Sequence, residues 1–188
     1  MTGGAEALAR LLRPGEDAAI ELGGTTAVLE SISGSRLEAE VLVLEPHELT
    51  ADEAALLRPG RDDAAALRRV LLRTGGGIPA AEATVILLAR RVPEAARTAL
   101  GISKSGRPTG GRRSVPLGTA LRGMGVRREQ LEVTPTPGRT GAAGAAQVLH
   151  ARAVLHTAVP IALVDEWFFG AFLEAFPVPD PEPAAHPG

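Results

Sequence analysis

The sequence has no cysteine and no tyrosine among its 188 residues, and only 3% of them are aromatic. The lack of cysteine excludes a disulfide framework and a thiolate nucleophile, and it fits a reducing compartment. The chain is still long enough to bury a core without bridges or metals, so we expect one domain.

A large excess of either charge is also missing, because the formal net charge is only −2. This balance argues against nucleic acid or an anionic membrane as the main partner. No run approaches the roughly 20 apolar residues that a membrane span needs, and no N-terminal segment resembles a signal peptide. We therefore expect a cytoplasmic protein with no membrane partner.

Motifs for metals and nucleotides are absent as well. The GRTGAAG stretch at residues 138–144 lacks both the Walker lysine and the GxGxxG spacing, and it is typical of a flexible connector. His150 and His156 share one side of a predicted strand, but they lie too far apart to chelate one ion without a third ligand. We therefore predict no metal and no cofactor.

Hydrophobic periodicity predicts helices first and then mostly strands joined by short turns. The predicted helices cover residues 4–12, 25–32, 51–57, 93–100 and 116–124, and the predicted strands cover 37–44, 67–73, 78–88, 130–136, 147–156 and 161–169. This order is typical of an α+β fold with an antiparallel sheet. We assign residues 1–176 to a single domain and residues 177–188, with five prolines, to a disordered tail.

Residues 101–115 differ from the rest because they are poor in apolar side chains and carry four glycines with Lys104, Arg107, Arg112 and Arg113. Two interpretations stay open. The segment is either a solvated basic surface loop or a lid whose arginines help to draw in an anionic ligand.

The stretch from Gln147 to Phe169 joins two apolar, β-prone runs through a predicted reversal at residues 157–160. The second run ends in Asp165 and Glu166, which are followed at once by three aromatic residues. Carboxylates in such an apolar strand end are costly to bury unless they have partners or a task. Strand alternation puts the two acids on opposite faces, and a bulge would exchange them.

Arg68 is the strongest candidate partner for Glu166. It shares a predicted strand face with Val70 and Leu72, so its guanidinium is expected to point into an apolar interior. One interpretation is a buried structural Arg–Glu pair. The other is an arginine fork for a substrate carboxylate, with the acid facing it.

Four motifs, in this order and spacing, resemble the chorismate pyruvate-lyase family. They are GGTTAVLES at Thr25, LRRVLL at Arg68, VPLGTAL at Leu117 and VPIALVDEWF at Glu166, and the resemblance runs from about Leu11 to Phe169. That family shares its fold with the UTRA-like ligand-binding domain of certain transcription regulators. The resemblance implies an antiparallel sheet of about six strands, helices on one side, and helical flaps over an enclosed ligand cavity.

The resemblance also implies a reaction and a set of site residues. Chorismate would lose pyruvate and give 4-hydroxybenzoate without a metal or a nucleotide. Arg68 would bind a carboxylate, and Glu166 would hydrogen-bond the ring hydroxyl or shuttle a proton. Thr25 and the backbone of Leu117 would complete the substrate site.

One departure from the family pattern concerns the second strand of the first hairpin. The family often has an arginine near its centre, where this chain has Ala83 and Thr84. Losing that arginine would weaken recognition of one carboxylate by about 1.5–3 kcal/mol. Arg152, which alternation places facing inward, would then compensate as a substrate-binding residue. The alternatives are an enzyme of this fold with another secondary-metabolite substrate, or a non-catalytic domain that binds an aromatic acid.

Overall fold

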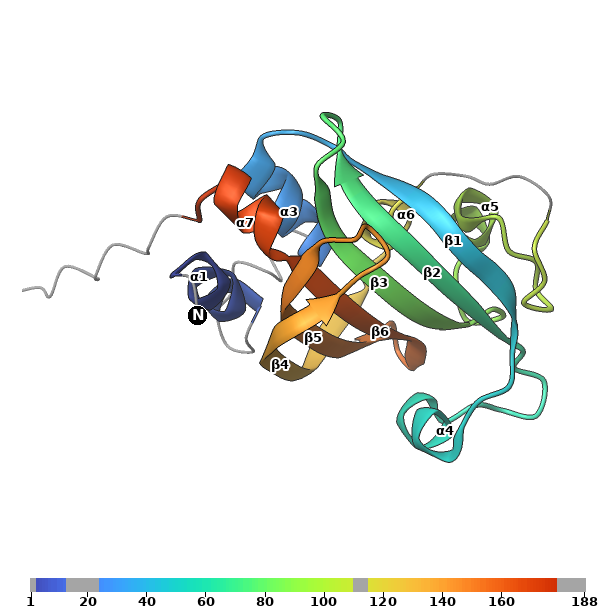
Figure 1. Cartoon of the computed structure of the whole chain (residues 1–188). Helices are drawn as coiled ribbons and strands as arrows, with labels where there is room; N and C mark the ends of the chain where they lie inside the picture. Colours follow the sequence, from blue (N-terminus) through green and yellow to red (C-terminus); the bar gives the residue numbers. More distant parts are fainter. Residues whose placement is uncertain (1–2, 13–23, 110–114, 179–188) are drawn as a thin grey trace, which may run out of the picture.

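Six antiparallel strands form one sheet in the order β1-β2-β3-β6-β5-β4 (Figure 1). The computed structural model describes residues 3–12, 24–109 and 115–178. The strands are β1 (Leu37–His47), β2 (Ala65–Thr74), β3 (Pro79–Leu88), β4 (Arg127–Thr140), β5 (Ala146–His156) and β6 (Pro160–Phe169). Every neighbouring pair is antiparallel, so the predicted α+β class is confirmed.

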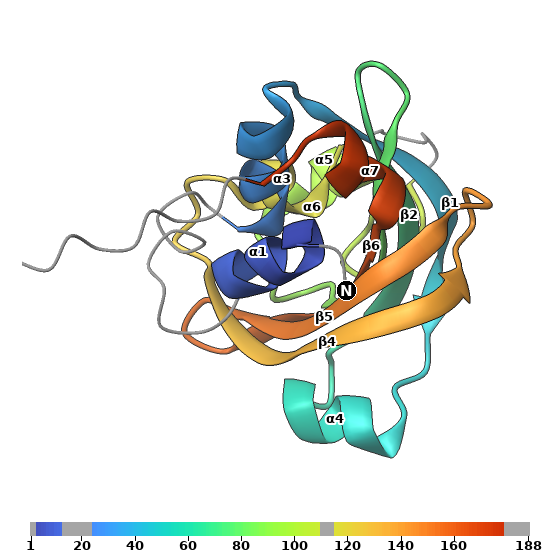
Figure 2. The same cartoon turned by 60° about the vertical axis from the view of Figure 1, so that its left-hand side comes forward.

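The described helices are α1 (Gly3–Leu12), α3 (Thr25–Ser33), α4 (Ala51–Leu57), α5 (Glu94–Leu100), α6 (Leu117–Leu121) and α7 (Gly170–Ala175). All of them except α4 lie on one face of the sheet, whereas α4 packs at one end of the other face (Figure 2). None of the described helices is long and apolar enough to cross a membrane.

The two faces of the sheet bury two separate sets of apolar side chains. The larger set joins the helices of the main layer to alternate strand residues such as Val70, Val85 and Val164. The smaller set packs Leu57 of α4 against Leu163 and neighbouring strand residues on the opposite face. Because both faces are partly apolar, alternation along a strand does not by itself tell which face holds the main core.

Local sequence signals explain where α4 and α3 begin and end. The Thr50 side chain accepts a hydrogen bond from the backbone N–H of Glu53, and Glu53 accepts one from the backbone N–H of Thr50. This capping box confirms the start predicted for α4. Helix α3 ends at Gly34, whose φ of 63° is the left-handed conformation that suits glycine.

Two elements that line the cavity, β4 and α6, have boundaries that differ from the predicted ones. Strand β4 begins at Arg127 rather than at residue 130, and it runs on to Thr140, into the predicted glycine-rich connection. Helix α6 ends at Leu121 rather than at residue 124, because Gly123 and Gly125 adopt positive φ angles that turn the chain toward β4.

The predicted basic loop contains ordered structure in its described part. Ile102 and Pro108 form an isolated bridge, and Gly106 lies so close to the Ala65 carbonyl that a Cβ atom there would be 2.7 Å from its oxygen. Lys104 and Arg107 are exposed, whereas Arg112 and Arg113 lie outside the described residues. The predicted proline-rich tail is also outside them from residue 179 onward.

Candidate functional site

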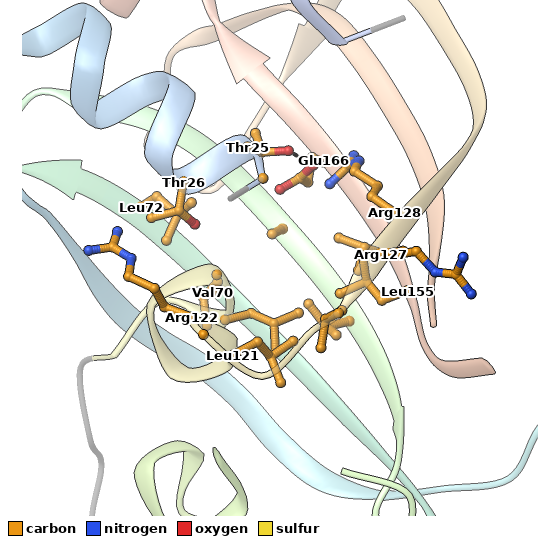
Figure 3. A pocket seen from close by; sticks show the side chains of 18 of the residues that line it. Thr25, Thr26, Val70, Leu72, Leu121, Arg122, Arg127, Arg128, Leu155 and Glu166 are labelled. Atoms are coloured by element: carbon orange, nitrogen blue, oxygen red, sulfur yellow. Dashed lines mark hydrogen bonds and ion pairs between the residues drawn. The ribbon is translucent and has the colours of Figure 1, made fainter. Parts of the chain in front are cut away.

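A cavity of about 170 Å³ lies between the sheet and the helices α3 and α6 (Figure 3). Strands β2, β3, β5 and β6 form its floor, and α3, α6, the segment that joins α6 to β4 and the start of β4 form the other walls. Nine aliphatic side chains line it: Val70, Leu72, Ala83, Val85, Leu117, Leu121, Val126, Leu155 and Val164. Such walls favour a ligand that is itself largely apolar.

One end of the cavity is polar, and Glu166 is at its centre. Its Oε2 atom accepts a hydrogen bond from Nη2 of Arg128 at 2.8 Å and another from Oγ1 of Thr25 at 2.9 Å. The side chains of Glu166 and Arg128 are 7% and 13% exposed, so this is a nearly buried ion pair. Arg128 and Thr25 give Glu166 the partners that a buried carboxylate requires.

Arg128 is held in place from behind by Gln130. The Nε atom of Arg128 donates to Oε1 of Gln130 at 2.9 Å. The Gln130 side-chain amide donates to the backbone carbonyls of Glu132 and Arg152, at 2.7 and 2.6 Å. These bonds cross a bulge in β4 between Gln130 and Glu132, so the guanidinium is fixed before any ligand arrives.

Two atoms of this polar end keep hydrogen-bonding capacity for a ligand. Both hydrogen bonds to Glu166 end on Oε2, and Arg128 donates through Nη2 and Nε, so Glu166 Oε1 and Arg128 Nη1 have no hydrogen-bond partner among the described residues. One atom accepts and the other donates. A ligand group that both donates and accepts a hydrogen bond therefore fits the pair.

Two further arginines line the cavity, but their charges are directed elsewhere. The guanidinium of Arg127 points away from the cavity (Figure 3). The guanidinium of Arg122 pairs with Glu30 at 3.1 Å. Arg128 is thus the cation that faces the interior, and Glu166 neutralises it.

Arg68 is fully buried, and no acidic side chain of the described residues pairs with it. It is 0% exposed, and its Nη2 atom donates to the carbonyl of Val115 at 2.7 Å, just before α6. Its Nε and Nη1 atoms have no hydrogen-bond partner in the described part of the chain. Burial lowers the pKa of Arg68 to about 10.

The structure does not form the expected pair between Arg68 and Glu166. Arg68 shares its sheet face with Val70 and lies opposite Val85 in the register, whereas Glu166 lies opposite Ala83. Arg68 is therefore one step along the strands from the cavity floor, and it is not among the residues that line the cavity. Arg128 takes its place beside Glu166.

Arg152 lies on the other face of the sheet, which corrects the expectation that it points inward. It is opposite Asp165 in the register, and its Nε atom is 3.6 Å from Asp165 Oδ1. Val154 lies on the same face as Arg152, but it packs into the smaller core under α4. An apolar residue two positions from Arg152 therefore did not show that this face lines the cavity. Arg152 therefore cannot compensate for Ala83, which does line the cavity.

The remaining candidates separate clearly between the two faces. Thr25, Leu117 and Glu166 all line the cavity, from α3, α6 and β6. Asp165 points to the opposite face, where it pairs with His150 at 3.0 Å. In the described segments, no group of three or more histidine or acidic side chains could hold a metal ion.

Sequence reasoning missed Arg128. Residues 127–129, Arg-Arg-Glu, contain no apolar side chain, so periodicity placed the start of the strand after them, at Gln130. The available signal was the need of a buried Glu166 for a cation, but strand order is required to see that β4 can supply one.

The comparisons with known proteins find a shared fold. No protein-family model and no curated protein match the sequence. The effector domain of PhnF from Mycobacterium smegmatis is similar with a TM-score of 0.55 and 15% identity, over 79% of this chain and 90% of that one. Full PhnF gives a TM-score of 0.52 and 15% identity over 78% of this chain, which spans 64% of that protein.

A third solved structure is the ligand-binding domain of a putative GntR-family transcriptional regulator from Bordetella bronchiseptica. Its TM-score is 0.49, with 17% identity over 72% of this chain and 86% of that one. At these identities the likeness concerns the fold alone. The chain therefore shares its fold with the PhnF effector domain, and the resemblance to the chorismate lyases themselves stays a prediction.

Proposed function

We propose that this chain is a small-molecule binding domain that holds an aromatic acid in its cavity without turning it over. The observation that carries the proposal is an aliphatic cavity that ends at one fixed polar group of Thr25, Arg128 and Glu166. Ligand pockets commonly combine apolar walls with a few well-placed polar groups. A flat ring with polar substituents at its ends matches that arrangement.

A ring hydroxyl is the substituent that suits the polar end. It would donate to Oε1 of Glu166 and accept from Nη1 of Arg128, which are the two atoms left without partners. A carboxylate there would satisfy Arg128 but would face the carboxylate of Glu166, and like charges at that distance repel.

The acid group belongs at the Arg68 end. Arg68 is a buried cation with no counter-ion in the described part of the chain, and an anion nearby in a poorly solvated interior lowers its free energy even without direct contact. Ala83 carries no charge, and Arg152 lies on the other face of the sheet. Arg68 is therefore the buried cation on the side of the cavity away from Glu166. We therefore expect one carboxylate to be favoured over two.

The fold neighbours support a binding role rather than a catalytic one. The PhnF structure with a TM-score of 0.55 is an effector domain. This support is by analogy of fold, so the function has to be tested on the site itself.

Thermal unfolding with three ligands tests the proposal. We expect 4-hydroxybenzoate to raise the Tm, 4-hydroxybenzamide to raise it less, and phthalate, a dianion without the ring hydroxyl, to have little effect. The R68M variant should lose the preference for the acid over the amide. If no small aromatic acid changes the Tm, the proposed function is wrong.

Catalysis of chorismate lysis is the second candidate, and the position of Glu166 inside the cavity favours it. In that reaction the ring loses a hydrogen, pyruvate leaves, and the aromatic product is 4-hydroxybenzoate. Incubation with chorismate would then release pyruvate and 4-hydroxybenzoate in equal amounts, and E166Q would stop the release. Binding of chorismate without release of either product would favour the binding domain instead.

A further inference from the structure

A groove of about 300 Å³ lies on the sheet face opposite the cavity, along the side of α4. One wall comes from the end of α4, with Leu56 and Arg58. The other wall comes from β4 and β5, with Glu129, Leu131 and His156. None of the groove residues lines the cavity, so the groove is a separate feature of the molecule.

Both large hydrophobic residues that are strongly exposed in the described chain lie beside this groove. Leu131 lines it and is 41% exposed, and Val159 is 46% exposed, between the groove residues Ala158 and Pro160. Leu131 is the extra residue of the β4 bulge, which turns its side chain out of the strand pairing. Exposed apolar residues gathered at one hollow indicate a contact surface.

The two walls of the groove carry opposite charges. Arg58 on the α4 wall is exposed, and its guanidinium has no ion-pair partner in the described part of the structure. Glu129 on the β4 wall is 63% exposed, and its partner is His156 at 2.9 Å. The groove is therefore positive on one side and negative on the other.

We propose that this surface is the interface with a second copy of the chain, related by a two-fold axis. A two-fold contact requires one surface that is complementary to itself, and this surface holds both the hollow and the projecting Leu131 and Val159. The α4 wall of one copy then lies over the β4 wall of the other. Arg58 of each copy meets Glu129 of its partner, which supplies the counter-ion that Arg58 lacks.

The free edge of β4 adds to this argument. Among the described strands, β4 is at the end of the sheet and pairs only with β5, so no described strand covers its outer edge. An open edge next to an exposed apolar side chain is a surface that proteins usually cover. The interface does not depend on the proposed ligand, because the cavity opens on the other face.

Sedimentation velocity of the whole chain over a concentration series tests the interface. We expect a dimer for the wild type and a shift to monomer for L131E and for V159E, with cooperative unfolding retained. The matched control is A171E, which adds the same charge at an exposed position of α7 on the opposite face. A wild type that stays monomeric at every soluble concentration, or an L131E variant that dimerises like A171E, overturns the proposal.

A charge exchange tests the predicted contact between Arg58 and Glu129. The variants R58E and E129R should each dimerise more weakly than the wild type, because each places two like charges at both symmetric contacts. A mixture of the two variants restores opposite charges at both contacts and should form mixed dimers. Weak dimerisation of each variant with no recovery in the mixture would place the interface elsewhere and contradict the proposed pairing.

Discussion

The Arg128 guanidinium donates to the Glu166 carboxylate at 2.8 Å, and both side chains line the cavity. The two residues come from β4 and β6, which are not neighbours in the sheet, since β5 lies between them. The Arg128 side chain therefore extends from the edge strand β4 across β5 to Glu166 on the central strand β6. This pair, rather than one between β2 and β6, determines the polar end of the site.

Removing Arg128 should destabilise the protein strongly. R128M leaves the Glu166 carboxylate buried with only Thr25 as a partner, and breaking a buried ion pair costs about 3–5 kcal/mol. Urea denaturation measures the loss. The matched control is R127M, because the guanidinium of Arg127 points away from the cavity and its removal should cost about 0.5 kcal/mol or less (Figure 3). Equal losses for the two variants would contradict the structural role given to Arg128.

Much of the fold was readable from the sequence because its local signals agree with one another. The Thr50–Glu53 capping box determined α4, and apolar runs with short turns gave the β2–β3 and β5–β6 hairpins. The β4 boundary failed because that strand begins with charged and polar residues. Edge strands bury less of their surface, so their sequences carry a weaker periodic pattern.

The site was harder to predict because it depends on which face of each strand is inside. Alternation correctly separated Asp165 from Glu166, but it could not show that Arg152 points to the second, smaller core side. It also could not show that Arg128 and Glu166 meet, since that contact joins strands that are not adjacent. Such relationships follow from strand order and curvature, which local sequence does not encode.

Replacing Arg68 by methionine should stabilise the protein without ligand. An apolar side chain of similar length removes a buried cation that has no acidic partner among the described residues. The desolvation penalty of such an ion is several kcal/mol, so the replacement should stabilise the folded protein by about 1–4 kcal/mol. The lost hydrogen bond to the Val115 carbonyl offsets part of that gain. Urea denaturation at neutral pH compares the two proteins, and an R68M variant less stable than the wild type would contradict this account.

The advantage of R68M should also depend on pH. Burial lowers the pKa of Arg68 to about 10 in the folded protein, below its value in the unfolded chain. Between these two values the unfolded chain binds more protons, so the stability of the wild type rises with pH there. The difference in the free energy of unfolding between R68M and the wild type should be largest below pH 10 and should decrease above it. A gap that stays constant across that range would show that the charge of Arg68 is not the cause.

Glu53 should stabilise α4 in a pH-dependent way. Burial works against its ionisation, but hydrogen bonds from the Thr50 backbone and from His47 outweigh this and lower the pKa of Glu53 below its usual value. The carboxylate therefore contributes stability above its unfolded-state pKa, and this contribution is lost as the pH falls through the folded-state pKa. The wild type should have a higher free energy of unfolding than E53Q at neutral pH. This difference should disappear as the pH falls below 4.5. Urea denaturation over this pH range measures the gap, and a gap that persists in acid would contradict the assignment.

Gly106 should tolerate alanine less well than Gly123. Both glycines have a φ of 75°, so both variants suffer the same backbone strain of about 1–2 kcal/mol. A Cβ atom at Gly106 would also lie 2.7 Å from the Ala65 carbonyl oxygen, whereas nothing lies within 4 Å of one at Gly123. Thermal or urea unfolding should place G106A below G123A by about a further 1–3 kcal/mol. Equal stabilities would mean that the loop around Gly106 moves away from β2 at little cost.

Calorimetric titration of 4-hydroxybenzoate into the wild type and into A83L tests the central claim most directly. Ala83 is on the cavity floor opposite Glu166, so leucine there fills the space that the ring would occupy. Thr84 points to the other face, and T84L is the matched control for a larger side chain in the same strand. We predict saturable one-to-one binding to the wild type and to T84L, and none to a folded A83L. No binding to the wild type, or equal binding to A83L, would contradict a ligand site in this cavity.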